Sequence, residues 1–172
     1  MNRVVTVISL FTIASLFVLI GCGPSQEEAL SAVKENASTV FHEEPLQSNE
    51  QFDNFSIYIP DGYNVVDESK SNLILESGNQ TYILFYNALE STTSQLNYQA
   101  AESNGNNELL EAFETEERFG YVRVTGLDKD YELQVGIGGV KITTQTTLSN
   151  MGEDVKEMMQ MANSMAYSDQ TE

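Results

Sequence analysis

The residue whose chemistry is most easily assigned is Cys22, the only cysteine in the chain. A thiolate sulfur is a nucleophile that can accept a lipid, whereas a disulfide needs a second cysteine. Cys22 follows Gly21 at the end of an uncharged, mostly apolar stretch, residues 4–20, which begins directly after the positive charge of Arg3. A charged start, an apolar run and a small residue are typical of a secretory signal peptide. We therefore predict a signal peptide over residues 1–21, cleaved between Gly21 and Cys22.

The alternative interpretation is an uncleaved transmembrane anchor, because residues 4–20 just reach the length that spans a bilayer. The sequence Leu19-Ile20-Gly21-Cys22 favours cleavage, since it resembles the lipobox of small bacterial lipoproteins of the Gram-positive type. In that family the cysteine receives a thioether-linked diacylglycerol. The resemblance implies a lipidated Cys22 that holds the chain on the extracytoplasmic face of the cell membrane. Two fatty chains suffice for stable attachment, at about 0.8 kcal/mol per buried CH₂ group.

The chain is strongly acidic, with 26 Asp and Glu, 8 Lys and Arg, and a formal net charge of −18. Nucleic-acid binding is disfavoured, because neutralising phosphates requires clustered basic residues. Acidity spread along a chain is typical of a solvated surface that keeps a protein soluble. The alternative is that the acidic surface attracts cations or a basic protein partner. Removing residues 1–21 leaves enough chain for one domain of ordinary size.

No catalytic or cofactor-binding pattern is evident in the rest of the chain. His42 is the only histidine, so a Ser-His-Asp or Cys-His site would have to use it. The adjacent residues His42, Glu43 and Glu44 point in different directions on a helix, which disfavours a metal site. Paired carboxylates could serve glycoside hydrolysis, but with 26 acidic residues some pair meets the required spacing by chance. We therefore expect no enzyme activity, no cofactor and no metal.

Three other motifs have structural explanations. Five methionines near the C-terminus could offer soft thioether ligands to copper(I), but most lie on one predicted helix face, where Met fills a core. Residues 136–139, Gly-Ile-Gly-Gly, lie between two predicted strands, which favours a turn over a phosphate loop. Residues 128–130 are too few for a calcium loop. The methionines are Met151, Met158, Met159, Met161 and Met165.

A short helix is predicted soon after Cys22. Ser25 and Glu28 match a capping box, in which each side chain bonds the backbone of the other residue. Apolar residues then recur at helical spacing as far as residue 41. We predict a helix over residues 26–42 within a lipidated tether, residues 22–54. The sequence leaves open whether this helix docks on the domain that follows.

The main domain is predicted over residues 55–167, where the pattern becomes β-like. A polar segment in its middle predicts a loop with a short helix near residues 96–101. After the last strand, apolar residues at positions i, i+3, i+4 and i+7 predict an amphipathic helix, with Met161 outside the apolar stripe and so exposed or at its margin. Alternating stretches bounded by turn residues predict strands over 55–59, 72–76, 81–86, 109–115, 119–125, 131–137 and 140–148.

Together these elements predict an α+β fold. An antiparallel sheet of about six or seven strands is covered by the C-terminal amphipathic helix and preceded by the N-terminal helix. Gly138 and Gly139 predict a hairpin between the last two strands. Residues 168–172 are predicted to form a flexible acidic tail.

The strand end containing Ile59, Pro60, Gly62 and Tyr63, together with the terminal helix, resembles small extracytoplasmic lipoproteins with a Mog1/PsbP-like fold. The resemblance covers roughly residues 50–167. It implies a binding or assembly factor for a protein or envelope component. The alternatives are a solute- or cation-binding lipoprotein and, less favoured, an envelope hydrolase. A pocket lined by polar and aromatic residues would favour solute binding, whereas an exposed apolar patch would favour a protein partner.

Overall fold

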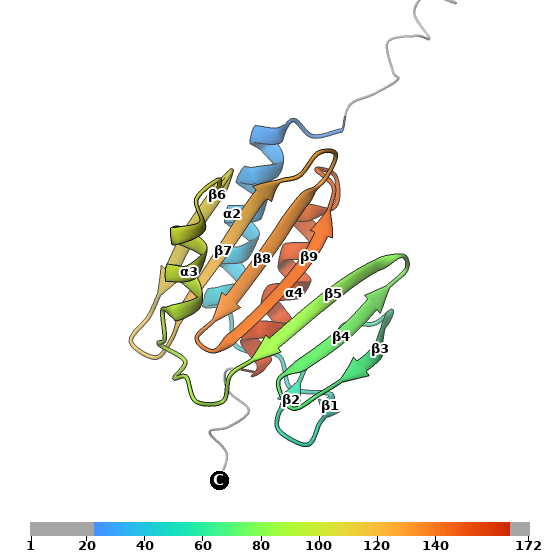
Figure 1. Cartoon of the computed structure of the whole chain (residues 1–172), viewed down its shortest axis with the longest axis vertical. Coiled ribbons are helices and arrows are strands. Elements are labelled where there is room, and N and C mark those ends of the chain that lie inside the picture. The colour runs from blue at the N-terminus through green and yellow to red at the C-terminus, as the bar shows by residue number, and fades with distance from the viewer. Residues whose placement is uncertain (1–22, 166–172) are drawn as a thin grey trace, which may run out of the picture.

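The computed structural model describes residues 23–165, which form an α+β fold around a seven-stranded antiparallel sheet (Figure 1). The predicted fold class is confirmed. The predicted signal peptide over residues 1–21, Cys22 and the predicted tail over residues 168–172 lie outside the described residues. The elements are α2 (Gln26–His42), β1 (Glu50–Gln51), β2 (Ser56–Ile57), β3 (Tyr63–Glu68), β4 (Asn72–Ser77), β5 (Gln80–Tyr86), α3 (Leu96–Asn104), β6 (Leu109–Glu114), β7 (Phe119–Gly126), β8 (Tyr131–Ile137), β9 (Val140–Thr146) and α4 (Met151–Met165).

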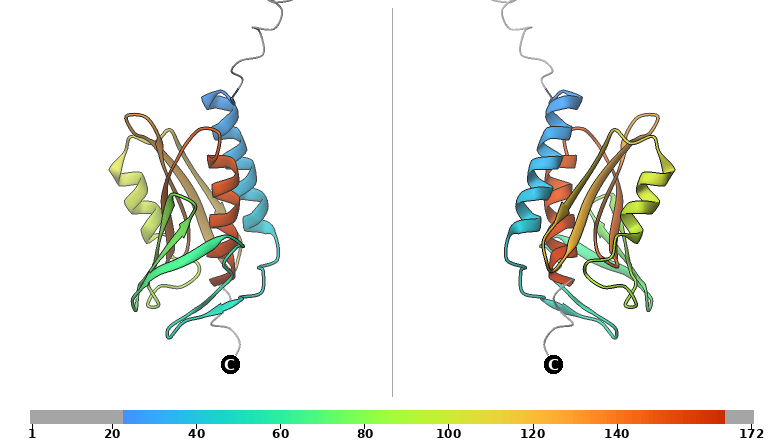
Figure 2. Two further views of the ribbon diagram at one scale, coloured as in Figure 1. Left: turned by 90° about the vertical axis from the view of Figure 1, so that its right-hand side faces the viewer. Right: turned by 90° about the vertical axis from the view of Figure 1, so that its left-hand side faces the viewer.

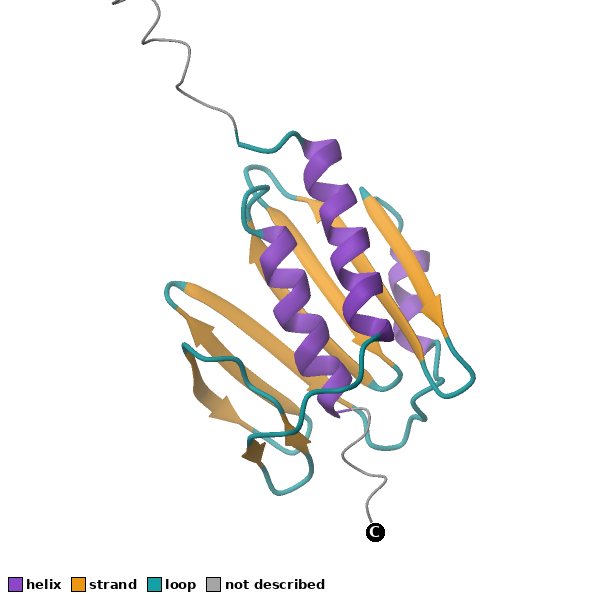
Figure 3. Ribbon diagram, turned by 180° about the vertical axis from the view of Figure 1, so that it is seen from behind, coloured by secondary structure: helices purple, strands orange, loops and turns teal. Residues whose placement is uncertain are grey.

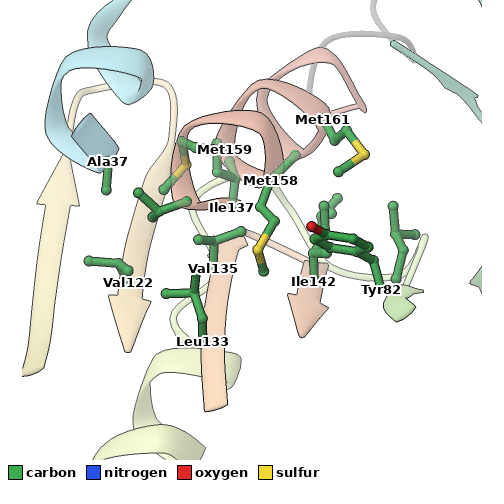
Figure 4. Packing of buried hydrophobic residues seen from close by; sticks show 14 of the residues in the cluster. Ala37, Tyr82, Val122, Leu133, Val135, Ile137, Ile142, Met158, Met159 and Met161 are labelled. Carbon is green, nitrogen blue, oxygen red and sulfur yellow. The ribbon is translucent and has the colours of Figure 1, made fainter. Parts of the chain in front are cut away.

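The strand order of the main sheet is β3-β4-β5-β9-β8-β7-β6. The last strand of the chain, β9, is therefore the central strand of the sheet. Helices α2 and α4 lie side by side against one face, and α3 covers part of the other (Figures 2 and 3). Alternate side chains of a strand point to opposite faces. The helix-facing side chains of β8 and β9, such as Leu133, Val135 and Ile142, are buried in one core with Met158 and Met159 of α4 (Figure 4).

Helix α2 has the predicted bounds and the predicted capping box. Glu28 N donates to Ser25 Oγ at 3.3 Å, and Ser25 N donates to Glu28 Oε2 at 2.8 Å. This helix docks on the domain, which the sequence had left open. The packed part of the chain therefore begins with this helix rather than at residue 55. Five buried residues of α2 belong to the same core as the sheet: Ala29, Val33, Ala37, Val40 and Phe41.

The first strand of the main sheet is β3 rather than the strand predicted over residues 55–59. Within that stretch, β2 pairs only with β1 in a separate two-stranded sheet. The segment crosses the last turns of α4, where Tyr58 N donates to Ser164 Oγ at 2.8 Å. Its apolar side chains are buried in the core although the segment does not pair with the main sheet, so their alternation does not indicate a strand of that sheet. They are Phe55, Ile57 and Ile59.

Met161 is fully buried, which contradicts the prediction that it is exposed or at the margin of the apolar stripe. The prediction assumed that α4 has one covered face. In the structure α4 contacts the sheet, α2 and the segment containing β2. Because these three contacts surround the last turns of the helix, Asn163 and Ser164 are buried as well.

Candidate functional site

The residues with predicted chemistry do not come together in the structure. His42 is exposed at the end of α2, where its Nδ1 lies 2.7 Å from Ser38 O. Within residues 23–165, no three His, Cys, Asp or Glu side chains are placed to hold a metal ion. The methionines of α4 lie in the core. Residues 136–139 include the predicted β8–β9 turn, with Gly138 at a φ of +53°.

The central group of the first candidate site is the carboxylate of Asp154, in the first turn of α4. Only 7% of this residue is exposed. Tyr82 Oη donates to Asp154 Oδ1 at 3.0 Å, Gln80 Nε2 donates to Oδ2 at 3.0 Å, and Thr146 Oγ1 also donates to Oδ2. These donors stabilise a charge that is otherwise costly to bury, and the start of a helix favours a negative charge. The sequence indicated only that Asp154 lies at the start of a helix. The side chains that donate to its carboxylate come from β5 and β9, which are brought beside it by the fold.

Two tyrosines extend this network to the edge of the sheet. The rings of Tyr63 and Tyr82 lie 4.9 Å apart between centroids, and Tyr63 Oη donates to Glu157 Oε2 at 2.7 Å. Burial raises the pKa of both phenols above the ordinary value for tyrosine. Both phenols therefore stay protonated at neutral pH and can act as hydrogen-bond donors to the carboxylates of α4.

An open polar pocket of about 640 Å³ lies next to Asp154. The turn between β4 and β5, the end of β9, the turn between β7 and β8 and the residue before α4 form its walls. Gln80 and Thr146 line the pocket and also bond Asp154, so the buried carboxylate fixes part of the wall. The described lining consists of hydroxyl and carboxamide side chains and the carboxylate of Asp130, without an aromatic ring.

The second candidate site is the face of β4 and β5 that points away from α2 and α4, which none of the helices within residues 23–165 covers (Figure 1). Ile74 and Ile83 pair across these strands, and Phe85 is the next residue of β5 on the same side. Ile83 is 50% exposed, whereas its neighbours Tyr82 and Leu84 face the helices and are buried. The apolar run over residues 82–86 indicates a strand that is apolar on both faces, and this signal was present in the sequence.

Two leucines that follow β5 in the chain are also exposed. The loop over residues 87–95 follows β5 and runs past the β8–β9 turn, where Asn87 N donates to Gly139 O at 3.0 Å. In this loop Leu89 is 95% exposed, and at the start of α3 Leu96 is 60% exposed. We call the surface made by Ile74, Ile83 and Phe85 the apolar face.

Charged residues surround the apolar face. Asp67 of β3 pairs directly with Ile74, and Glu76 lies two residues further along β4 on the same side. On the other side, Lys141 of β9 pairs with Phe85, and its Nζ lies 5.5 Å from the centre of the ring. The border next to β3 and β4 is therefore acidic, and the border next to β9 carries a cation.

Comparison of the chain with protein-family models, with curated proteins and with solved structures found no match. The lipoprotein and Mog1/PsbP-like resemblances therefore stay predictions from the sequence. In the part of the chain that the structure describes, none of the helices combines the length and apolar character needed to cross a membrane.

Proposed function

We propose that this chain is an extracytoplasmic lipoprotein whose domain is a non-enzymatic binding or assembly factor for a protein partner. Cleavage after Gly21 and lipidation of Cys22 anchor it to the cell membrane. Helix α2 begins at Gln26, so the intervening residues keep its first turn within roughly 15 Å of the lipid. Because α2 is part of the core, the domain is held close to the membrane surface.

The observation that carries the partner proposal is the apolar face. A folded domain buries apolar strand faces where it can, and contiguous exposed ones mark interaction surfaces. Here two helices cover one face of the sheet, whereas Ile83 on the opposite face is half exposed. Small-molecule sites are concave and enclose their ligand, so an open face fits the surface of another protein better.

The charge distribution restricts the partner. Asp67 and Glu76 border the apolar face, and the whole chain carries a net charge of −18. A second copy of the chain would bring two acidic surfaces together, which self-repulsion opposes. A partner that combines apolar side chains with Lys or Arg meets both the exposed apolar residues and their acidic border. The Mog1/PsbP-like resemblance supports the same class of function.

Cys22→Ala tests the anchor. In cells fed labelled palmitate, we expect label in the wild-type protein and in a Ser25→Ala control, because the control retains Cys22. The Cys22→Ala protein should carry no label and should leave the membrane fraction. If it stays uncleaved and membrane-bound, and the wild type also carries no label, the transmembrane interpretation replaces the lipoprotein proposal.

Ile83→Asp tests the apolar face. After cross-linking in intact cells, we expect the main cross-linked protein to fall about tenfold or more in yield, because the substitution places a charge at the centre of the contact. Leu127→Asp is a matched control, since Leu127 is 48% exposed but lies in the β7–β8 turn. Equal yields from both variants and the wild type would show that partners do not use this face.

A further inference from the structure

We propose that the polar pocket beside Asp154 binds a small organic cation that carries several N–H groups, such as a polyamine. This inference goes beyond the proposed function, because the pocket and the apolar face are formed by different residues. It depends neither on the anchor nor on a protein partner. It rests on how the buried carboxylate orients the side chains of the pocket wall.

The orientation of Gln80 follows from hydrogen-bond chemistry. An ionised carboxylate can only accept, so the nitrogen of the Gln80 carboxamide has to face Asp154. Gln80 Nε2 lies 3.0 Å from Asp154 Oδ2 and 3.1 Å from Thr144 Oγ1. The Thr144 hydroxyl in turn donates to Thr81 O at 2.7 Å, so it accepts from Gln80. Both N–H groups of Gln80 are used in this way, and its Oε1 is left to accept from the pocket.

Two other wall residues are oriented by the same logic. Thr146 uses its hydroxyl hydrogen to bond Asp154 Oδ2, which leaves Oγ1 as an acceptor. Gln145 Nε2 donates to Asp130 Oδ2 at 2.9 Å, so Gln145 Oε1 points away from that carboxylate. Carboxylates inside and beside the pocket therefore engage donors of Gln80, Thr146 and Gln145, and these three residues keep oxygen acceptors for a ligand.

Charge selects a cation over a neutral or anionic ligand. Asp130 contributes a carboxylate to the lining, and Asp154 holds a second one behind it. The described lining contains neither Lys nor Arg. A ligand with N–H donors can therefore form charge-assisted hydrogen bonds to Asp130 and further bonds to Gln80 and Gln145.

The lining fits an organic cation better than a metal ion or a quaternary ammonium ion. Calcium and magnesium take six or more oxygen ligands, several of them usually carboxylates or water. Among the described lining residues only Asp130 supplies a carboxylate, and the volume of about 640 Å³ suits a small organic molecule. Quaternary ammonium ions lack N–H groups and are recognised by aromatic rings, whereas the described lining has no such ring.

The test is a calorimetric titration of the full chain, purified in detergent, with spermidine as the probe. We expect saturable binding to the wild type and a dissociation constant about tenfold higher for Asp130→Asn, which removes the charge but keeps the shape. Asp128→Asn is the matched control. It removes the same charge from the same turn, but Asp128 does not line this pocket. We expect that control to change the dissociation constant by less than about twofold.

Gln145→Leu removes an acceptor without changing the charge and should weaken spermidine binding several-fold. We expect each variant to melt at the wild-type temperature, because these side chains lie at the surface or in a turn. Unchanged melting then shows that a loss of binding does not come from a loss of the fold. Equal losses in Asp130→Asn and Asp128→Asn, or equal heats from magnesium chloride at the same ionic strength, would reveal diffuse attraction to an acidic surface and overturn the proposal. Absence of saturable spermidine binding to the wild type would also overturn it.

Discussion

Replacing Arg118 by alanine is expected to lower the free energy of unfolding by about 3 kcal/mol and to loosen α2 from the sheet. Arg118 precedes β7 and is only 6% exposed. Its Nη1 donates to Asn163 Oδ1 at 2.5 Å, and its Nη2 donates to the backbone oxygen of Phe41. Alanine leaves these buried acceptors without a charged donor, and unpaired buried groups account for most of the expected loss.

These contacts join three elements at the C-terminus of α2. Asn163 of α4 donates through Nδ2 to Val40 O at 3.0 Å, a carbonyl of the last helical turn that also accepts from Glu43 N at 3.2 Å. The guanidinium of Arg118 lies 4.9 Å from the centre of the Phe41 ring. A positive charge at this end of a helix is also favoured by the helix dipole. Arg118 therefore contributes charge, hydrogen bonds and ring contact at one position.

The measurement is urea denaturation of the wild type, Arg118→Ala and Lys34→Ala. Lys34 also joins α2 to the sheet, with its Nζ 2.8 Å from Glu111 Oε1, but 54% of its side chain is exposed. Exposed ion pairs contribute about 0–1 kcal/mol, so this control should stay near the wild type. Hydrogen exchange should accelerate in α2 of Arg118→Ala. Equal stability of the two variants would mean that the buried contacts do not hold α2 in place.

Met161→Ala is expected to lower the free energy of unfolding by about 2–5 kcal/mol, the range for truncating a large buried side chain. Methionine and alanine are both good helix formers, so the change reports mainly the lost packing and the cavity. Met161 has no exposed surface in the structure. The sequence pattern predicts a different result, because a side chain at the margin of the stripe loses little on truncation.

Lys156→Ala is the control for this experiment, since Lys156 lies on the exposed side of the same helix. We expect it to change the free energy of unfolding by less than about 0.5 kcal/mol. Thermal or urea denaturation of both variants distinguishes the two expectations for Met161. A change as small as that of the control would place Met161 outside the core and would argue against the packing of β2 over α4.

Some elements were predictable because the interactions that define them are local. Ser25 and Glu28 bond each other across one helical turn, so the start of α2 could be predicted from adjacent residues. The β8–β9 turn depends on the positive φ of Gly138, which glycine adopts at little cost. The apolar stripe of α4 likewise follows from helical spacing and is buried as predicted, apart from the additional burial of Met161.

The strand predicted over residues 55–59 shows where local pattern is insufficient. Its apolar residues alternate as in a strand and are buried, but the segment packs on α4, and Phe55 contacts the ring of Tyr86 in β5. The edge of the main sheet is formed instead by β3, whose residues are mostly exposed. An alternating pattern reports which side chains are buried, whereas the element that buries them is decided by the packing of distant segments.

Both candidate sites also depend on contacts between distant segments, which local sequence patterns do not predict. The sequence by itself determined the lipobox pattern at Cys22, the acidic composition and the strands and helices set by local spacing. Only the tertiary structure placed Tyr82 and Gln80 against Asp154, more than seventy positions away in each case. Only the packing of α2 and α4 on one face of the main sheet left Ile83 exposed on the opposite face. Local hydrogen bonds and periodicity act over a few residues, but a buried charge and an uncovered face arise from contacts between distant elements.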